Sequence, residues 1–217
     1  MKDNAKNTGL LVVITGASGA GKDAVMDGVF KDPQVAELNL QRVVTCADRS
    51  PRPGEIDGVQ YHFVDCNKLK EMAANGELVE PITPFGTSNK ATPSFEIKRM
   101  LDGENLVWRI DPSRAAEVAS HKFFQKSFPE NSEIMDSHTI VLNVIAPREE
   151  IVQRRMKRDG QNYDPNEYIA RDNCEAPYLK ILREYAVNIE NLDGQLDKAI
   201  ESASGAILRF YGKTKNG

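Results

Sequence analysis

The 217-residue chain has few cysteines, no long apolar run and no excess of positive charge. Its three cysteines, Cys46, Cys66 and Cys174, are odd in number and widely spaced, which argues against a disulfide framework. Together with the histidines they show no zinc-ligand spacing. The net charge of −4 does not favour nucleic acid as a partner. A reducing, cytoplasmic setting fits this composition best.

Membrane and export signals are also lacking. No apolar run approaches the ~20 residues that a membrane-spanning helix needs, and the first nine residues, MKDNAKNTG, contain no apolar signal region. We therefore expect a cytoplasmic protein without a membrane partner. With 40% hydrophobic and 28% charged residues, the composition is typical of a globular protein with a sizeable core.

The sequence GASGAGKD at residues 16–23 is the most informative stretch. It follows the apolar run of residues 10–14, which predicts a buried parallel strand, and it precedes a helix-compatible segment at residues 24–30. Strand, glycine-rich turn and helix form the context of a phosphate-binding loop for a nucleoside triphosphate. The residues expected to bind the phosphates are Gly16, Ala17, Ser18, Gly19, Ala20, Gly21, Lys22 and Asp23.

Two residues at the end of this loop carry its chemistry. Lys22 is expected to reach the β- and γ-phosphates. Asp23 stands where a Ser or Thr normally ligates Mg²⁺, so it is a candidate metal ligand through its carboxylate.

Strands alternate with helices along the chain, which indicates an α/β fold with a parallel core sheet in three layers. We expect core strands within residues 38–45, 105–111, 139–145 and 187–189, in addition to the first strand. In the middle of the chain we expect a strand at 59–64, a helix at 67–75 capped by Asn67, a short strand at 78–80 and a loop at 81–93. Residues 126–138 are polar and predict a surface connection.

We expect one domain spanning residues 1–217, in which three kinds of segment are distinguished. Its core would comprise residues 10–44, 93–146 and 177–217. Residues 45–92 would form an insertion with its own small sheet, and residues 147–176 a helical lid.

The stretch RSPRPGEIDGVQY suggests an anion site. Arg49 and Arg52 lie three apart on a segment stiffened by prolines, so their guanidinium groups can clasp one phosphate. Tyr61 can add a hydroxyl donor. The alternative is an exposed basic loop.

Glu80 follows two apolar residues and offers two acceptor oxygens side by side, which matches the N1–H and 2-amino donors of guanine. A lone glutamate at a strand end can equally be a solvated surface residue. The arginine-rich segment 148–171 suggests a lid that stabilises a transferred phosphoryl group and excludes water, or else a solvated basic helix face.

Taken together, these stretches resemble the guanylate kinase family, P-loop enzymes that transfer a phosphoryl group from ATP to GMP. The most specific similarity lies at residues 45–65, TCADRSPRPGEIDGVQYHFVD, followed by FGTS at 85–88 and NIENLDGQLDKAI near the C-terminus. The resemblance implies ATP as donor with Mg²⁺, GMP or dGMP as acceptor, and a monomer or homodimer. It also implies that residues 45–92 bind the nucleoside monophosphate.

The resemblance further implies roles for individual residues. Glu80 and Thr45 would read the guanine, assisted by Thr87 and Asp111. Arg49, Arg52 and Tyr61 would hold the GMP phosphate, with Phe85 at the position of a further phosphate contact. The residues implied to stabilise the transferred group are Lys22, Arg155, Arg158 and Arg171.

Departures from the family pattern leave other functions open. Asp23 replaces Ser or Thr, Arg109 replaces the first Asp of a D-x-D pair, and Phe85 replaces a tyrosine whose hydroxyl would contact the GMP phosphate. Since a carboxylate appears in the loop where one is lost from the strand, Asp23 is either a Mg²⁺ ligand or the ion-pair partner of Arg109, and we favour the ion pair because a negative charge beside the β-phosphate is unfavourable. The GKD of the loop and the DPSRA run at 111–115 resemble ribose 1,5-bisphosphate phosphokinase. A kinase of that or another small phosphorylated acceptor is therefore an alternative, as is a non-catalytic binding module.

Overall fold

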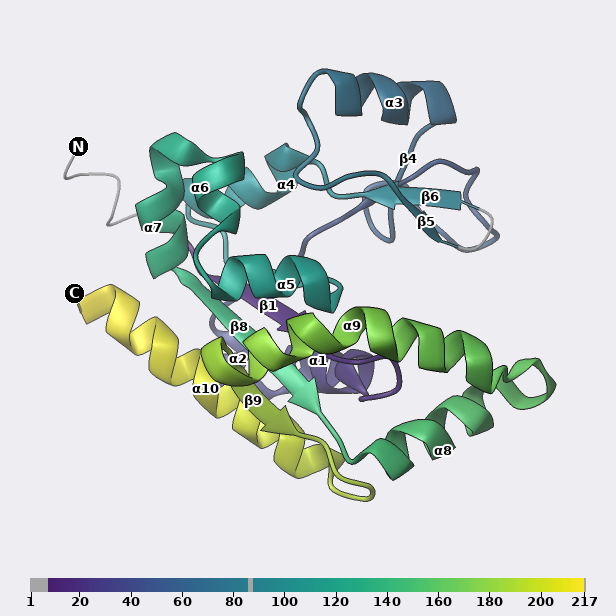
Figure 1. Cartoon of the computed structure of the whole chain (residues 1–217). Helices are drawn as coiled ribbons and strands as arrows, with labels where there is room; N and C mark the ends of the chain where they lie inside the picture. Colours follow the sequence, from purple (N-terminus) through teal and green to yellow (C-terminus); the bar gives the residue numbers. More distant parts are fainter. Residues whose placement is uncertain (1–7, 86–87, 217) are drawn as a thin grey trace.

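A five-stranded parallel sheet forms the centre of the protein in the computed structural model, which describes residues 8–85 and 88–216 (Figure 1). The strand order is β2-β7-β1-β8-β9, with β1 in the middle. Val13 of β1 pairs with Trp108 on one side and with Val141 on the other. The strands are β1 (Leu11–Thr15), β2 (Gln41–Arg42), β7 (Leu106–Arg109), β8 (Thr139–Ile145) and β9 (Val187–Glu190).

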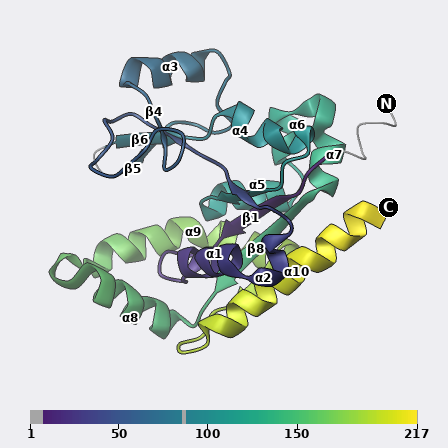
Figure 2. The ribbon, with the colours of Figure 1, turned by 180° about the vertical axis from the view of Figure 1, so that it is seen from behind.

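Helices cover both faces of this sheet because both faces of its strands are apolar. Leu11 and Val13 belong to the core beneath helices α5 (Pro112–Ala119) and α9 (Pro165–Tyr185). Val12 and Ile14 belong to the core beneath helices α1 (Lys22–Lys31) and α10 (Leu196–Asn216). Figures 1 and 2, which view the molecule from opposite sides, each show one of these helix layers in front. The predicted three-layer α/β/α fold is therefore confirmed.

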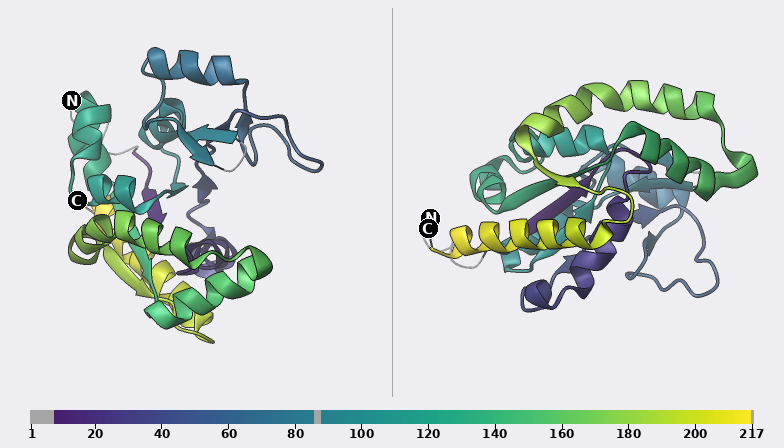
Figure 3. Two further views of the ribbon diagram at one scale, coloured as in Figure 1. Left: turned by 45° about the vertical axis from the view of Figure 1, so that its right-hand side comes forward. Right: turned by 90° about the horizontal axis from the view of Figure 1, so that it is seen from below.

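A smaller sheet stands apart from the central one, as both Figure 1 and the left view of Figure 3 show. Its order is β4-β3-β6-β5, with β3 and β4 parallel and the other pairs antiparallel. The strands are β3 (Cys46–Ala47), β4 (His62–Phe63), β5 (Thr83–Phe85) and β6 (Ser88–Ala91), and helix α3 (Cys66–Ala74) packs with them.

Three expectations for this region were wrong in detail. Residues 78–80 form no strand, only an isolated bridge between Leu78 and Pro93. The segment 81–93, expected to be a loop, instead contains β5 and β6. Helix α3 is capped by Asp65 rather than Asn67, because the Asp65 Oδ1 accepts a hydrogen bond from the Lys68 N–H at 2.8 Å.

The expected polar connection at 126–138 was also wrong. This part of the chain contains helices α6 (Phe123–Ser127) and α7 (Ser132–Ser137), with one 3₁₀ turn at Pro129–Asn131 between them. Phe123 and Met135 are fully buried, and the Phe123 ring lies 5.4 Å from that of Trp108, centroid to centroid. These few apolar side chains anchor an otherwise polar segment to the core.

The remaining helices flank the central sheet and the smaller sheet. Helix α4 (Ser94–Lys98) continues into a 3₁₀ turn at Arg99–Asp102, and the short helix α2 (Pro33–Ala36) follows α1. Helix α8 (Arg148–Asp159) runs into the 3₁₀ turn Gly160–Asn162 and then α9, and the two helices form an arm beside the core (Figure 1). Among the described residues, no helix combines the length and apolar character of a membrane span.

Candidate nucleotide-binding site

The loop between β1 and α1 has the backbone conformation that its glycines allow. Gly19 and Gly21 have φ angles of 87° and 90°, in the left-handed region, and Gly21 caps α1. A Cβ atom at Gly21 would lie 2.1 Å from the Asn191 Nδ2, and one at Gly16 would lie 2.3 Å from the Val144 carbonyl oxygen. The loop therefore needs glycine both for its curvature and for its close packing.

Side chains from distant parts of the chain hold two carbonyl groups of this loop. The Arg155 Nε donates to the Ser18 carbonyl at 2.8 Å, and the Asn191 Nδ2 donates to the Ala20 carbonyl at 2.8 Å. The Arg154 Nη1 also donates to the Ala20 carbonyl, at 3.4 Å. Drawing these carbonyl groups toward neighbouring side chains favours a loop that presents N–H groups to an anion.

Sequence reasoning assigned no role to Arg154 or Asn191. Asn191 is separated from Ala20 by 171 residues. Its contact depends on where β9 ends beside the loop, which no local pattern indicates. Arg154 was visible only as one of several basic residues on a helix.

Lys22 lies at the start of α1 among four charged side chains. Burial lowers the pKa of its ammonium group, Asp23 and Glu175 raise it, and Arg109 and Arg171 lower it further. A partly desolvated ammonium group loses less hydration when it meets a phosphate oxygen, and its attraction to that oxygen is stronger than in open solvent.

Asp23 and Arg109 form the expected ion pair. The Arg109 Nη1 lies 3.2 Å from the Asp23 Oδ1, and the two side chains are 42% and 63% exposed. Arg109 ends β7 and Asp23 opens α1, so this pair joins the phosphate-binding loop to the neighbouring strand.

Asp23 is also the carboxylate in the loop that could hold Mg²⁺. The described residues contain no group of three or more His, Cys, Asp or Glu side chains that could bind a metal. Proteins commonly hold Mg²⁺ through one or two carboxylates together with substrate phosphates and water, and one exposed carboxylate fits that pattern.

The three arginines expected in the lid each have an acidic partner. Arg155 is only 1% exposed and binds Asp172 through both Nη atoms, at 2.9 and 2.6 Å. The Arg158 Nε donates to Asp159 at 2.8 Å, and the Arg171 Nε donates to Glu175 at 2.7 Å. The residues expected to line the transferred phosphate are thus not all gathered at Lys22.

Among these arginines, Arg171 acts on Lys22 electrostatically, since it contributes to lowering the lysine pKa. Arg155 instead links the loop to α9, with its guanidinium carbon 4.5 Å from the centroid of the Tyr168 ring. Among the three lid arginines, Arg171 therefore acts on the charge of Lys22, whereas Arg155 connects the loop to α9.

Arg109 also lines a cavity of about 520 Å³, which lies between the two sheets. Thr45 and Tyr61 line it together with Arg109. The Tyr61 hydroxyl is 2.5 Å from the Lys90 Nζ. Two of the residues expected to bind the acceptor therefore share one cavity, and Arg109 connects that cavity to the phosphate-binding loop.

Arg49 lines a neighbouring hollow, but its partner Glu55 lines the cavity of Thr45 and Tyr61, and the Arg49 guanidinium carbon lies 5.4 Å from the centroid of the Tyr61 ring. Its Nη atoms bind the two carboxylate oxygens at 2.6 and 2.7 Å, and this contact brings the pKa of Glu55 down to about 2. The Arg49 guanidinium also lies over the Phe63 ring, 5.2 Å from its centroid. Arg52 contributes its backbone N–H, which donates to Glu55 at 2.7 Å. A phosphate bound by Arg49 would have to compete with Glu55.

Glu80 borders another cavity, of about 400 Å³, which Arg114 also lines. Its Oε1 accepts hydrogen bonds from the Thr92 N–H at 3.0 Å and from the Thr92 hydroxyl at 2.5 Å. Burial raises the pKa of Glu80, and the nearby Asp111 charge adds to this. Asp111 caps α5, where its Oδ1 accepts from the Ser113 N–H at 2.9 Å.

The Asp111 charge acts on Glu80, whereas Thr45 lines the other cavity. Thr87 lies outside the described residues. Phe85 belongs to β5, and its side chain lies outside the described part of the chain as well.

Comparison with known proteins places this geometry in context. A family model described as guanylate kinase matches residues 8–125. The guanylate kinase of Gluconobacter oxydans is 30% identical over 200 residues, which cover 92% of this chain and 86% of that protein. The guanylate kinase of Trichormus variabilis is 31% identical over 165 residues, which cover 76% of this chain and 73% of that protein.

Among solved structures, the fold is similar to that of a guanylate kinase from Anaplasma phagocytophilum. The TM-score is 0.55 at 19% sequence identity, and the match covers 96% of this chain and 88% of that chain. At this level of identity the likeness shows the fold alone.

Proposed function

The chain belongs to the guanylate kinase family, and from that premise we propose that it transfers the γ-phosphoryl group of ATP to GMP or dGMP, giving ADP and GDP. The observation that best supports this is the position of Arg109. It pairs with Asp23 of the phosphate-binding loop and also lines the cavity that Thr45 and Tyr61 share. The proposed ATP site and the proposed GMP site would therefore meet at the Arg109 side chain.

On the donor side, the N–H groups of residues 16–23 and the start of α1 would bind the ATP phosphates. Lys22 would contact the β- and γ-phosphates, and its partial desolvation would strengthen that contact. Asp23 would hold Mg²⁺ together with phosphate oxygens. The metal, when bound, would neutralise part of the phosphate charge.

On the acceptor side, Arg49, Arg52 and Tyr61 would hold the GMP phosphate. Arg49 would exchange one anionic partner for another, because its guanidinium group is already arranged around the Glu55 carboxylate. A bidentate pair of this kind keeps the guanidinium in place until a phosphate arrives.

Glu80 and Thr45 would read the guanine, with Asp111 and Thr87 assisting. Glu80 would offer its Oε2 to one guanine donor, and a contact with both donors would require its Oε1 to give up a hydrogen bond from Thr92. Glu80 lines one cavity, and Thr45 and Tyr61 line another. For these residues to contact one GMP molecule, we propose that the insertion moves toward the core when GMP binds.

The lid would supply positive charge to the transferred group. Arg171 is expected to take part because its charge already reaches Lys22, although it would need to leave Glu175. Arg155 and Arg158 would need to leave Asp172 and Asp159. No covalent intermediate is required, since positioning and electrostatic stabilisation account for this kind of transfer.

A second acceptor class is favoured by Arg109 itself. A guanidinium group on the acceptor cavity, at a position where the family usually has an acid, adds positive charge that suits an acceptor with an additional phosphate. Ribose 1,5-bisphosphate is such a compound. A non-catalytic module that binds nucleotides without turnover is the third possibility.

ADP release from ATP and Mg²⁺, measured with GMP, dGMP, AMP, UMP or ribose 1,5-bisphosphate, distinguishes these functions. The proposal predicts turnover with GMP or dGMP and little with AMP or UMP. Turnover with the ribose compound alone would contradict it in favour of the second acceptor class. Absence of turnover with every acceptor would favour the binding module.

A further inference from the structure

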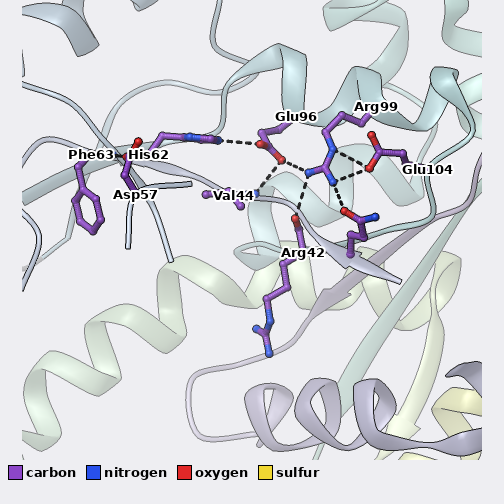
Figure 4. A network of polar contacts seen from close by, with 9 residues as sticks. Arg42, Val44, Asp57, His62, Phe63, Glu96, Arg99 and Glu104 are labelled. Carbon is purple, nitrogen blue, oxygen red and sulfur yellow. Dashed lines mark hydrogen bonds and ion pairs between the residues drawn. The ribbon is translucent and has the colours of Figure 1, made fainter. Parts of the chain in front are cut away.

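Glu96 is a buried carboxylate outside the groups so far assigned to substrate binding. Its side chain lies in α4 and the residue is 4% exposed. Its Oε1 is 2.8 Å from the His62 Nε2, and its Oε2 accepts from the Arg99 Nη1 at 2.7 Å and from the Val44 N–H at 3.1 Å (Figure 4). Three separate parts of the chain meet on this one carboxylate.

Two of these contacts belong to segments that carry proposed acceptor-binding residues. Val44 directly precedes Thr45, and His62 directly follows Tyr61. The His62 backbone N–H also donates to the Thr45 carbonyl at 2.9 Å. Glu96 therefore binds the main chain directly before Thr45 and the side chain directly after Tyr61, and the side chains of Thr45 and Tyr61 line the same cavity.

The third contact ties the carboxylate to the core. Arg99 donates to Glu104 through its Nε and Nη2, at 3.2 and 2.7 Å, and its Nη2 donates to the Gln41 Oε1 at 2.7 Å. Figure 4 shows this chain of contacts running from His62 through Glu96 and Arg99 to Glu104. Gln41 belongs to β2 of the central sheet, so the network spans the junction between the two sheets.

We propose that Glu96 is a positioning residue for the phosphoryl acceptor. It contacts no substrate, but it fixes the register of Thr45 and Tyr61 relative to the core, so that both reach the same acceptor. The Val44 N–H, the Arg99 guanidinium and the His62 ring nitrogen converge on it, which suits a side chain with two acceptor oxygens. This role rests on the proposed function, because the acceptor is taken to be a nucleoside monophosphate.

The contrast between Glu96→Ala and Glu104→Ala tests this role. Both variants remove a carboxylate from Arg99, but only the first releases Val44 and His62. Glu96→Ala is expected to raise the acceptor KM by about tenfold and to leave the ATP KM within about twofold, whereas Glu104→Ala leaves both near the wild-type values. An equal rise in both KM values in Glu96→Ala, or the same acceptor defect in Glu104→Ala, would overturn the proposal.

A conservative variant separates geometry from charge. In Glu96→Gln the amide oxygen can still accept from Val44 and Arg99, and the amide NH₂ can donate to the His62 Nε2 in the tautomer that carries its proton on Nδ1. This variant should therefore keep an acceptor KM close to that of the wild type. If Glu96→Gln is as impaired as Glu96→Ala, the retained contacts are not what matters and the proposal is wrong.

If Glu96→Ala does not fold, His62→Ala replaces it, because His62 is partly exposed and this change leaves the Val44 and Arg99 contacts of Glu96 in place, although it also removes the ring contact with Phe95. It should raise the acceptor KM without changing the ATP KM, and an unchanged acceptor KM would refute the positioning role. Hydrogen exchange at the Val44 amide gives a readout without substrate. It should be faster in Glu96→Ala than in Glu104→Ala, and equal rates would count against the proposal.

These measurements keep the two proposals distinct. If the wild type phosphorylates none of the acceptors, the proposed function fails, and the exchange rate of the Val44 amide still decides whether Glu96 organises this junction.

Discussion

The ion pair between Asp23 and Arg109 should couple the phosphate-binding loop to the acceptor cavity. At 3.2 Å the Coulomb attraction would be about 5 kcal/mol with an effective dielectric constant of about 20. The side chains are 63% and 42% exposed, so solvent screening reduces this strongly, and measured pairs of this kind retain at most about 1 kcal/mol. We therefore expect a coupling of about 1 kcal/mol, or about fivefold in kcat/KM.

A double-mutant cycle measures this coupling. Arg109→Asp alone places a second carboxylate beside Asp23 and near the triphosphate, so it should lower kcat/KM for ATP more than Asp23→Ser does. Adding Asp23→Ser to Arg109→Asp removes that repulsion and should recover about fivefold. The free energy of unfolding should change by less than about 1 kcal/mol in each variant.

A matched control comes from Glu71, which forms a comparably exposed ion pair with Lys68 on α3, at 3.2 Å. Glu71→Ser should leave kcat/KM unchanged. If the Asp23 and Arg109 effects on kcat/KM add within about 0.3 kcal/mol, the two residues act independently and the compensation between them is refuted.

Three further predictions concern single residues. Lys22→Met should lower kcat by about 100-fold or more while raising Tm slightly, because burial already penalises the charged lysine, and steady-state kinetics with calorimetry would check both. Glu80→Gln should raise the GMP KM and relax the choice of base. The pKa of Glu80 lies above its ordinary 4.5, so acidification should protonate it, and raise the wild-type GMP KM, at a higher pH than for an ordinary carboxyl. This pH-dependent rise of the GMP KM should be absent in Glu80→Gln. Asp172→Asn leaves the buried Arg155 without its carboxylate and should lower the free energy of unfolding by about 2 kcal/mol in denaturant titrations; an unchanged midpoint would show that the pair does not brace the loop.

Local patterns were sufficient to predict the phosphate-binding loop and the central sheet. The apolar run at 10–14 and the glycines after it act over a few neighbouring residues, and their structure follows from short-range geometry. The pairing between Asp23 and Arg109 was expected on other grounds, because both residues depart from the family pattern at positions near the metal and the phosphates.

The surroundings of Arg155 could not be predicted in this way. Its charge suggested a phosphate contact, yet it is buried against Asp172 and the Ser18 carbonyl. That outcome depends on how α8 and α9 pack against each other and on the loop, a tertiary relation without a sequence period. The helices at 123–137 were missed for a related reason, because a few buried side chains such as Met135 decide their position.

The contacts of Glu96 also could not be predicted from the sequence. It lies in a segment that predicts only a helix, and its neighbours in sequence give no sign of His62 or Val44. The convergence of three contacts becomes visible only when β4 and the chain before β3 are folded against α4.

The most direct measurement of the central claim is phosphorus NMR of the wild-type protein with ATP, GMP and Mg²⁺. The account predicts that the γ-phosphorus signal of ATP is replaced by the β-phosphorus signals of ADP and GDP in equal amounts, with little inorganic phosphate. Loss of the γ signal to inorganic phosphate alone, or no loss while ribose 1,5-bisphosphate is consumed under the same conditions, would contradict it.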